Sequence, residues 1–593
     1  AVAGLRGPNA VAGRRGPNAV AGLRGPNAVA GRRDPNAVAG LRGPKALTGA
    51  PPTEARAAPD GLVLEPWLGT LVRCYPDRVP TLVHALDRAA SAFPDRTALE
   101  TAEGTVTYGD LAELVEGAAE RLAEEGLAPG DRLAVCLRNG LDIVVAIWAC
   151  ARAGLLFVGL STRLAAPQWA YMLRHSGARL ALGHPEFIAG LRDAAAEAGL
   201  TPDRVREVGD HLTGRRRAWR GATIPFPDED ATYGVIYTSG TTGRPKASRL
   251  VHRGAMHSAT AYVRTLGLTA ADRTAIVFPL FYITGHVAQV TPMMLVGGTS
   301  VTVAEVVPRA FVQLMAERRI TYLMVVPSLW PLLLRVPEFR WPDLAHVQIG
   351  AFGGSPVPLS TVTSLRQRMP QLRLFDLYGL TETHSPATAL LDHEFRRKPG
   401  SVGRLLPCAE ARVVDDDARD VPPGQAGELW LKGPMVTSGY FGDDEATAAA
   451  ITDGWLHTGD VGRIDDEGYV FVLDRKKDMI MRGGFKVYSV ELEYLLVGHP
   501  DIAEAAVFGV PDHLAYEAVA AYVVPAEGRT VAPDQVQQWV AARMADYAVP
   551  RHVRVVASIP RNRTGKVEKR HLRETFHSES TARTRGEDGH ERG

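Results

Sequence analysis

The feature that most constrains the fold of this chain is a repeated alternation of short apolar runs with longer helical stretches. Strand-like runs lie at Arg132 to Cys136, Tyr233 to Tyr237, Thr274 to Val277 and Tyr322 to Val326, and stretches rich in Ala, Leu and Arg separate them. Strands that alternate with helices are typical of βα units, which build parallel sheets. The sequence therefore predicts an α/β fold.

The pattern of expected helices and strands changes twice in the second half of the sequence. From about Gly400, short strands with Gly-rich turns such as GELWLKG and GYVFVLDR predict a small antiparallel barrel or sheet. After Asp474, the segments VELEYLLVGHP and PDQVQQWVAARMADY are compatible with a separate α+β unit. At 593 residues the chain is too long for one ordinary core, so several packed units are expected.

The first 45 residues are five near-copies of the nonapeptide AVAGLRGPN. A Gly and a Pro in each copy, with no bulky apolar face, bury too little surface to offset the entropy of ordering the backbone. We expect a disordered tail over residues 1–59, and we favour a passive tail over a basic arm for membrane or nucleic acid. The predicted domains are then a large domain over 60–474, a small domain over 475–576 and a polar tail over 577–593.

The overall composition excludes several classes of function. Lys plus Arg number 67 and Asp plus Glu number 66, so the chain has no bulk attraction for nucleic acid or anionic lipid. The four cysteines form no C-x-x-C pair, which argues against a disulfide framework or a zinc cluster and fits a reducing cytoplasm. The most apolar stretch, Ile143 to Leu160, contains Arg152 and Gly154, so it predicts a helix, a turn and a strand rather than a transmembrane span. No secretory signal is predicted either.

The strongest local motif is YTSGTTGRPK, which runs from Tyr237 to Lys246 directly after a strand-like run. Its glycines let backbone amides approach an anion, and Lys246 supplies a compact positive charge. The hydroxyls of Ser239, Thr241 and Thr242 can donate further hydrogen bonds. Pro245 stands between Gly243 and Lys246, so this is not a Walker A loop. The motif predicts a phosphate-binding loop.

This motif resembles the phosphate-binding signature of the adenylate-forming superfamily, which includes acyl-CoA synthetases, non-ribosomal adenylation domains and luciferases. The resemblance covers roughly residues 80 to 575. It implies a large N-terminal domain of two doubly wound sheets plus a small β-barrel, followed by a small mobile α+β domain.

Further family motifs follow in the expected order. In YGLTET the resemblance places Tyr378 against adenine, Thr381 on the α-phosphate and Glu382 on Mg²⁺, and a carboxylate with phosphate oxygens is a ligand set that Mg²⁺ prefers. The loop that begins at Gly353 resembles the adenine-side loop. Asp460, in WLHTGD, would accept hydrogen bonds from both ribose hydroxyls through its paired oxygens.

The last motifs belong to the predicted small domain. The resemblance places Arg475 on the ribose, Lys477 at the hinge between the domains, and the catalytic lysine of adenylation at Lys566, where a cation would offset repulsion between the carboxylate and the α-phosphate. The RGGFKVY segment would line the pantetheine tunnel. The complete predicted nucleotide- and CoA-binding set is Thr238, Ser239, Gly240, Thr241, Thr242, Gly243, Lys246, Gly354, Ser355, Pro356, Tyr378, Gly379, Asp460, Arg475, Lys477, Gly483, Gly484 and Phe485.

Two positions depart from the family pattern. Ala247 stands where most members have Gly, and Tyr282 stands where many acyl-CoA synthetases have His, which concerns the acyl pocket rather than the reaction. The candidate pocket residues are Tyr282, Gly285, Val326, Phe352 and His384. Their mix of aromatic, small and polar groups suits a medium-chain, branched, cyclic or aryl acid.

The resemblance therefore implies a ligase that uses ATP, Mg²⁺ and coenzyme A to convert a carboxylic acid, such as one from fatty acid metabolism, into its CoA thioester. CoA is favoured as acceptor because no carrier domain is expected after Lys566, Pro279 to Gly285 lacks an acidic residue for an α-ammonium group, and Phe485 suits a pantetheine tunnel. The alternatives are a stand-alone enzyme that loads an aryl or fatty acid onto a carrier protein and, more remotely, a non-catalytic nucleotide-binding scaffold.

Overall fold

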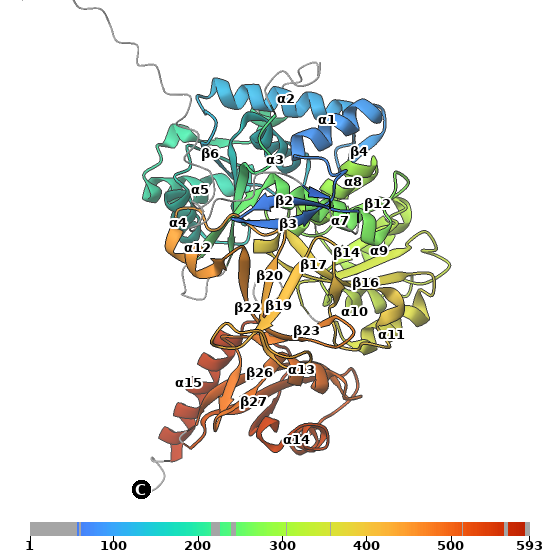
Figure 1. Cartoon of the computed structure of the whole chain (residues 1–593), viewed down its shortest axis with the longest axis vertical. Helices are drawn as coiled ribbons and strands as arrows, with labels where there is room; N and C mark the ends of the chain where they lie inside the picture. Colours follow the sequence, from blue (N-terminus) through green and yellow to red (C-terminus); the bar gives the residue numbers. More distant parts are fainter. Residues whose placement is uncertain are drawn as a thin grey trace, which may run out of the picture. The chain divides into compact units, whose positions relative to one another are not determined.

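The computed structural model describes residues 56–57, 61–214, 226–238, 245–303, 305–355, 357–512, 514–561 and 567–587. All of them belong to one unit of the chain, Leu41–Gly593. Within it, two large sheets and one smaller sheet position the candidate site (Figure 1).

The first large sheet has six strands in the order β11-β10-β7-β6-β8-β9. All its neighbours are parallel except β10 and β11, which form an antiparallel hairpin. The strands are β6 (Arg132–Cys136), β7 (Leu156–Gly159), β8 (Leu180–Gly183), β9 (Val205–Glu207), β10 (Thr232–Thr238) and β11 (Lys246–Val251). Two of them, β6 and β10, coincide with predicted strand-like runs.

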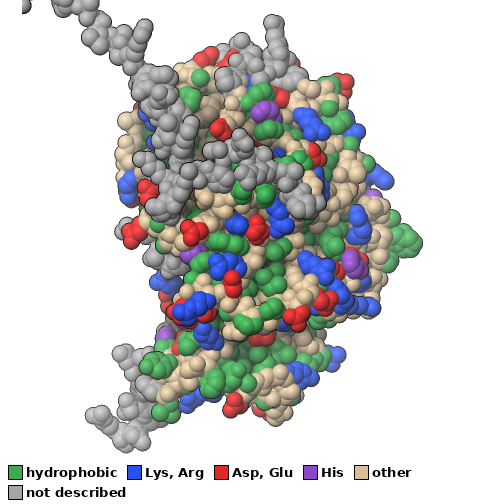
Figure 2. Space-filling model, in the orientation of Figure 1, with side chains coloured by type: hydrophobic (Ala, Val, Ile, Leu, Met, Phe, Trp, Pro, Cys, Tyr) green, Lys and Arg blue, Asp and Glu red, His purple; other side chains and the backbone are tan. Residues whose placement is uncertain are grey.

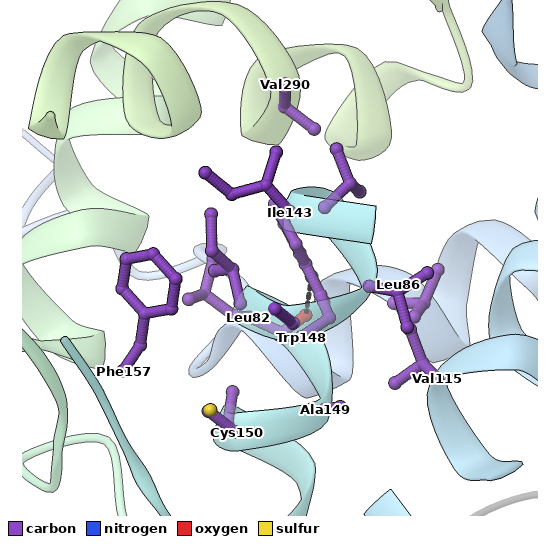
Figure 3. Close-up of a cluster of buried hydrophobic side chains, with 14 of the residues drawn as sticks. Leu82, Leu86, Val115, Ile143, Trp148, Ala149, Cys150, Phe157 and Val290 are labelled. Atoms are coloured by element: carbon purple, nitrogen blue, oxygen red, sulfur yellow. Dashed lines mark hydrogen bonds between the residues drawn. The ribbon is translucent and has the colours of Figure 1, made fainter. Parts of the chain in front are cut away.

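Helices cover both faces of this sheet, as alternate residues of β6 show. Leu133 and Val135 pack into a cluster with α1, α2 and α3, of which Figure 3 shows the part around Trp148. Ala134 and Cys136 point the other way and pack with α4 and α5. The helices are α1 (Leu82–Ala92), α2 (Tyr108–Glu124), α3 (Leu141–Ala153), α4 (Ala166–Ser176), α5 (Pro185–Ala198) and α6 (Gly209–Leu212), with a 3₁₀ turn η2 (Pro202–Arg204).

The most apolar stretch of the sequence forms the predicted helix, turn and strand. Helix α3 ends at Ala153. The next residue, Gly154, has a left-handed φ of 68° that suits glycine, and β7 starts at Leu156. Arg152 is buried on α3, where its Nε donates to Glu116 of α2 at 2.8 Å. Within the residues that the structure describes, no helix is long and apolar enough to cross a membrane.

The second sheet has a parallel central part in the order β16-β15-β14-β12-β13-β4, and β5 pairs with β4 at its edge. Leu323 and Val325 of β14 face the helices α9, α10 and α11, whereas Tyr322 and Met324 face α7 and α8. This sheet is therefore doubly wound too. Its parallel strands are β4 (Thr97–Glu100), β12 (Arg273–Ile276), β13 (Thr299–Thr302), β14 (Tyr322–Val325), β15 (Ile349–Gly353) and β16 (Arg373–Leu380), and β5 is Thr105–Thr107. Its helices are α7 (His252–Leu266), η3 (Thr284–Val290), α8 (Thr291–Val296), α9 (Pro308–Glu317), α10 (Leu329–Leu334) and α11 (Leu359–Arg368).

The prediction that the short strands after Gly400 close into a small barrel is wrong. The short antiparallel strands exist, but they extend the second sheet from β16 and β17 in the order β17-β18-β23-β22-β20-β19, and among the described residues they close into no barrel. They do so because β18 pairs with both β17 and β23, which continues one ladder. A strand pattern fixes the faces of a ladder but not whether its ends meet. The strands are β17 (Ser385–Leu390), β18 (Gly403–Leu405), β19 (Glu410–Val414), β20 (Gly427–Lys432), β21 (Ile451–Thr452), β22 (Trp455–Ile464) and β23 (Tyr469–Arg475), with η4 (Thr381–Thr383), η5 (Asp392–Glu394) and α12 (Asp444–Ala450) among them.

The last part of the chain has its own sheet and core. The sheet runs β25-β24-β27-β26, with β28 beside β27, and the change from the second sheet to this one falls between Arg475 and Ile480. Helix α15 continues to Glu587, so part of the segment predicted as a polar tail is helical. The elements are β24 (Ile480–Arg482), β25 (Phe485–Val487), α13 (Ser489–Val497), β26 (Ile502–Asp512), β27 (Tyr516–Pro525), α14 (Pro533–Ala541), η6 (Asp546–Ala548), β28 (His552–Val555) and α15 (Lys569–Glu587).

A three-stranded strap precedes the first sheet. It consists of β1 (Arg56–Ala57), β2 (Val63–Trp67) and β3 (Thr70–Cys74). Arg253 of α7 pairs with Glu65 of the strap at 2.5 Å and with Glu229 at 2.7 Å, and Trp67 Nε1 donates to the Val436 carbonyl at 3.1 Å. On the face that Figure 2 shows, basic and acidic side chains are interspersed, in keeping with the near-zero net charge.

Candidate functional site

The candidate site lies where parallel strands of the second sheet end. Strands β12, β15 and β16 end at Ile276, Gly353 and Leu380, and each is followed by a predicted motif. Because β15 and β16 are parallel neighbours, with Gly353 opposite Leu377, their carboxyl ends meet at the same edge. Ligands of open α/β sheets bind at such edges.

The first group at this edge surrounds the Glu382 carboxylate in η4. Glu382 Oε1 lies 3.4 Å from the Thr238 hydroxyl at the end of β10 and accepts a hydrogen bond from the Tyr440 hydroxyl at 3.1 Å. The Lys246 ammonium lies 4.9 Å from the centre of the Tyr440 ring. Burial, together with the neighbouring Glu382, raises the pKa of Tyr440. The residues on both sides of the predicted phosphate loop and the carboxylate predicted to hold Mg²⁺ thus share one cluster.

This cluster fits a magnesium–nucleotide complex in its chemistry. A carboxylate with hydroxyl groups beside it offers the hard oxygen ligands that Mg²⁺ takes, and phosphate oxygens would complete the set. Thr381, predicted on the α-phosphate, begins η4, and its carbonyl accepts the His384 amide at 3.1 Å. Its hydroxyl is therefore placed by a tight turn next to Glu382.

The second group links Tyr378, Asp460 and Arg475. The Tyr378 hydroxyl donates to Asp460 Oδ2 at 2.6 Å, and Arg475 Nε pairs with Oδ1 at 2.6 Å. Asp460 is only 2% exposed, whereas Arg475 is 42% exposed. Burial raises the pKa of Tyr378, and Asp460 raises it further. Burial disfavours the Arg475 cation, but Asp460 and Tyr378 outweigh this effect and raise its pKa.

Several predicted site residues lie outside the described part of the chain. They are Ser239, Gly240, Thr241, Thr242 and Gly243 of the phosphate loop, Pro356 and the catalytic lysine Lys566. The strands on either side of the phosphate loop are described: β10 and β11 pair antiparallel, with Thr238 opposite Lys246.

Glycines of the adenine-side segments have clear structural reasons. Gly354 follows β15 with a left-handed φ of 88°, and Ser355 beside it is exposed. A Cβ at Gly379 would lie 2.6 Å from the Ser385 carbonyl, where β16 and β17 approach closely around a bulge. Both glycines shape the edge beside Tyr378.

The predicted hinge and CoA-side residues lie in the last sheet and in the connection that leads to it. Lys477 is exposed in a turn after β23 that the Asp478 amide closes on the Arg475 carbonyl at 2.9 Å. Gly483 and Gly484, with φ of 58° and 88°, form the tight turn between β24 and β25. Phe485 is 56% exposed, and its ring stacks on Tyr547 at 4.6 Å.

The predicted acyl-pocket residues do not form one open surface. Phe352 is fully buried and packs against Trp330 and Phe395, so its role as a pocket wall is corrected to a core role. His384 is also fully buried, and both of its ring nitrogens bind main-chain groups, so it presents no polar group to a substrate. The position of a residue relative to a motif does not show whether its side chain points toward the sheet edge or into the interior.

The other three pocket candidates follow β12 and β14. Tyr282 and Val326 are partly buried. Gly285 is buried at a tight turn, where an added Cβ would lie 2.5 Å from the Pro279 carbonyl. This close approach explains the glycine without any substrate.

Three residues of the site were not predicted from the sequence. Tyr440 contacts Glu382, and nothing in its Gly-rich surroundings distinguishes it. Asn139 Nδ2 donates to the carbonyls of Ile276 and Phe278, while its Oδ1 accepts the Leu280 amide at 2.9 Å. Gln289, in η3, accepts the Phe278 amide at 3.1 Å and donates to the Ala275 carbonyl at 2.6 Å. The two carboxamides fix the segment that leads to Tyr282.

Comparisons with known proteins match nearly all of the region that these motifs span. The sequence profile of the AMP-binding enzyme family matches residues 86–441, and that of the AMP-binding enzyme C-terminal domain matches residues 491–566. An indoleacetate–CoA ligase from Aromatoleum aromaticum is 34% identical over 82% of this chain and 97% of its own. A fatty acid–[acyl-carrier-protein] ligase from Streptomyces coeruleorubidus is 32% identical over 86% of this chain and 99% of its own.

A comparison with solved structures agrees with these sequence similarities. The o-succinylbenzoate CoA synthetase from Bacillus subtilis, solved with its acyl-adenylate intermediate, superimposes with a TM-score of 0.73 at 30% identity, over 83% of this chain and 97% of that one. The same enzyme solved with ATP and a magnesium ion gives a TM-score of 0.72.

Proposed function

Because the chain belongs to the AMP-binding enzyme family, we propose that it is an acid–thiol ligase that activates a carboxylic acid with ATP and transfers the acyl group to coenzyme A. In the first step a carboxylate oxygen attacks the α-phosphorus of ATP, which forms the acyl adenylate and releases pyrophosphate. In the second, a thiol attacks the acyl carbon, which forms the thioester and releases AMP.

The observation that carries this proposal is the convergence of two chemically different groups at one sheet edge. Thr238, Lys246 and Glu382 form a cluster whose hydroxyl, ammonium and carboxylate groups suit phosphate and a cation. Tyr378 and Asp460 form a group with an aromatic ring and paired carboxylate oxygens, which suits adenine and ribose. Tyr378 of the second group lies on β16 and Glu382 of the first lies in η4, the turn that directly follows this strand, so one nucleotide can contact both groups.

In the adenylation step the protein groups position two anions and stabilise the charge that develops between them. Lys246 would hold the pyrophosphate leaving group, and Lys566 and Thr381 would contact the α-phosphate. Magnesium held by Glu382 would neutralise phosphate charge when bound. Asp460 and Arg475 would hold the ribose, so that the α-phosphorus stays in line with the carboxylate.

In the thioester step the turn at Gly483 and Gly484 and the Phe485 ring would line the path of the pantetheine thiol. A glycine turn lets another chain or ligand approach the backbone closely, and the exposed Phe485 ring offers an apolar surface. Lys477 would act as the hinge about which the small domain turns between the two steps.

A second acceptor is supported by one relative, the fatty acid–[acyl-carrier-protein] ligase. That protein is similar over 86% of the chain and the indoleacetate–CoA ligase over 82%, so the extent of the similarity does not separate the two acceptors. Free CoA as an effective acyl acceptor supports the ligase proposal, whereas acyl adenylate that reacts only with a carrier protein supports the alternative.

The test is a mass-spectrometric assay of the purified full chain with ATP, Mg²⁺, CoA and a pool of aryl, cyclic and fatty carboxylic acids. We expect AMP and a new CoA thioester. Lys566→Ala should lower acid-dependent AMP release about a hundredfold or more, whereas Lys432→Ala in β20 should leave it unchanged. Equal rates for the two variants would contradict the assignment of Lys566.

A further inference from the structure

His384 is the residue at which three parts of the candidate site meet. It directly follows η4, which carries Thr381 and Glu382, and it precedes β17. Its φ is 49° and that of Ser385 is 87°, so two consecutive residues other than glycine adopt left-handed backbone angles. Such angles cost energy and persist only where the surroundings enforce them. This turn directs the imidazole into the interior rather than toward the sheet edge.

The two ring nitrogens bind two different segments. The Val251 amide donates to Nε2 at 2.9 Å, and Nδ1 lies 2.8 Å from the Met435 carbonyl. A carbonyl oxygen only accepts, so Nδ1 carries the proton and the ring is neutral.

Both partners belong to segments that carry groups of the phosphate side. Val251 ends β11, the strand that begins with Lys246. Met435 starts the segment that leads to Tyr440, and within that segment the Thr437 amide donates to the Glu382 carbonyl at 2.7 Å. One ring therefore connects the strand of Lys246, the turn of Glu382 and the segment of Tyr440.

The ring occupies a socket that fits it closely. A Cβ added at Gly254 of α7 would lie 2.5 Å from Nδ1, so this position leaves room for the imidazole only because it is glycine. The His384 side chain is fully buried. A socket of this kind fixes the ring position, which in turn fixes the distances from its two partner segments to Glu382.

We infer that His384 is a positioning residue that holds the Glu382 carboxylate in place relative to Lys246 and Tyr440, and that it thereby sets the affinity of the site for the magnesium–nucleotide complex. The inference rests on the proposed function and deepens it. Tyr378, Asp460 and Arg475 bind one another without His384, so the nucleoside side should not depend on it.

Two substitutions separate the two contacts. In His384→Asn the amide nitrogen can replace Nδ1 and keep the Met435 bond, while the contact with Val251 is lost. In His384→Gln the amide oxygen can replace Nε2 and keep the Val251 bond, while the contact with Met435 is lost. Val362→Ala, a buried change on α11 outside this network, is the control for a general loss of stability.

The measurement is calorimetric binding of Mg²⁺·ATP, and of AMP without a metal, to each folded full-length variant. We expect each His384 variant to weaken Mg²⁺·ATP binding about tenfold, the usual effect of one lost hydrogen bond, and AMP binding less than twofold. The control should change neither. Circular dichroism verifies folding; if one variant does not fold, the other, or Gly254→Ala, which displaces the ring, serves in its place.

The inference is overturned if the His384 variants bind both ligands as the wild type does, or if both affinities fall equally, because the ring then only supports the fold. A wild-type chain that binds Mg²⁺·ATP but releases no AMP with any acid refutes the proposed function alone, since the binding comparison still decides the role of His384. A wild-type chain that binds neither nucleotide refutes both.

Discussion

The Tyr378–Asp460–Arg475 group gives a prediction in which a structural role and a binding role can be separated. Asp460→Asn keeps the size of the side chain but removes its charge. The Tyr378 hydroxyl can still donate to the amide oxygen, whereas Arg475 loses the carboxylate that lies 2.6 Å from its Nε. In the variant, Arg475 faces a neutral side-chain amide. The NH₂ group of that amide stands where one acceptor oxygen of Asp460 was.

The size of each effect follows from burial. Removing one partner of a fully buried ion pair costs about 3–5 kcal/mol, but Arg475 is 42% exposed and solvent screens it. We therefore expect the free energy of unfolding to fall by about 1–2 kcal/mol. If the carboxylate also accepts hydrogen bonds from two ribose hydroxyls, their weakening should cost a further 2–3 kcal/mol or so of ATP binding, about 30- to 150-fold in KM.

The assay combines denaturant unfolding with initial rates of AMP release at varied ATP and saturating acid. A matched control is Asp392→Asn, because Asp392 pairs with Arg366 at 3.1 Å near the opposite end of β16. Both variants should lose similar stability, but only Asp460→Asn should raise KM for ATP. An unchanged KM in Asp460→Asn, with the expected loss of stability, would show that Asp460 is structural and refute the nucleotide role.

Three further predictions test other parts of the structure. Glu382→Gln should lower kcat/KM about a hundredfold and shift the Mg²⁺ activation curve to higher concentration, with the melting temperature little changed; an unshifted curve would contradict a metal role. Gln289→Leu should lower the free energy of unfolding by about 2–4 kcal/mol because buried backbone groups lose partners, and should raise KM for the acid more than for ATP; equal changes in both KM values would argue against it. Burial lowers the pKa of His252 to about 3 and that of His286 to about 4, below the unfolded value near 6.5, so the unfolding free energy should fall as pH drops from about 6.5 to about 4. His286→Gln should flatten this dependence in denaturant titrations at several pH values, and an equally steep dependence would contradict the reasoning.

The local patterns of the sequence predicted the elements around the site well. The runs from Arg132, Tyr233, Thr274 and Tyr322 are strands, because short apolar runs that alternate with helical stretches are typical of the buried strands of βα units. Membership of the adenylate-forming superfamily, the ligase class and the α/β fold with a smaller final domain are confirmed. The barrel is not, since closure depends on which strand edges meet.

The acyl pocket was the weakest prediction for a related reason. Phe352 and His384 lie within a few residues of the motifs, but the strand and the left-handed turn direct both side chains into the interior. Tyr440 and Gln289, which contact the site, lie outside every motif. Their roles come from contacts across long sequence separations, which composition and spacing do not encode.

The sequence by itself determined the family and the type of reaction, because the motifs that carry the family resemblance are short and local; the residues that would meet the nucleotide stay a prediction from the same motifs. Only the tertiary structure decided how these short segments lie together. Glu382 meets Thr238 because two sheets end side by side, and His384 binds β11 and the Met435 segment because α7 leaves a glycine socket for its ring. Such distances depend on packing between distant segments, which no local pattern contains.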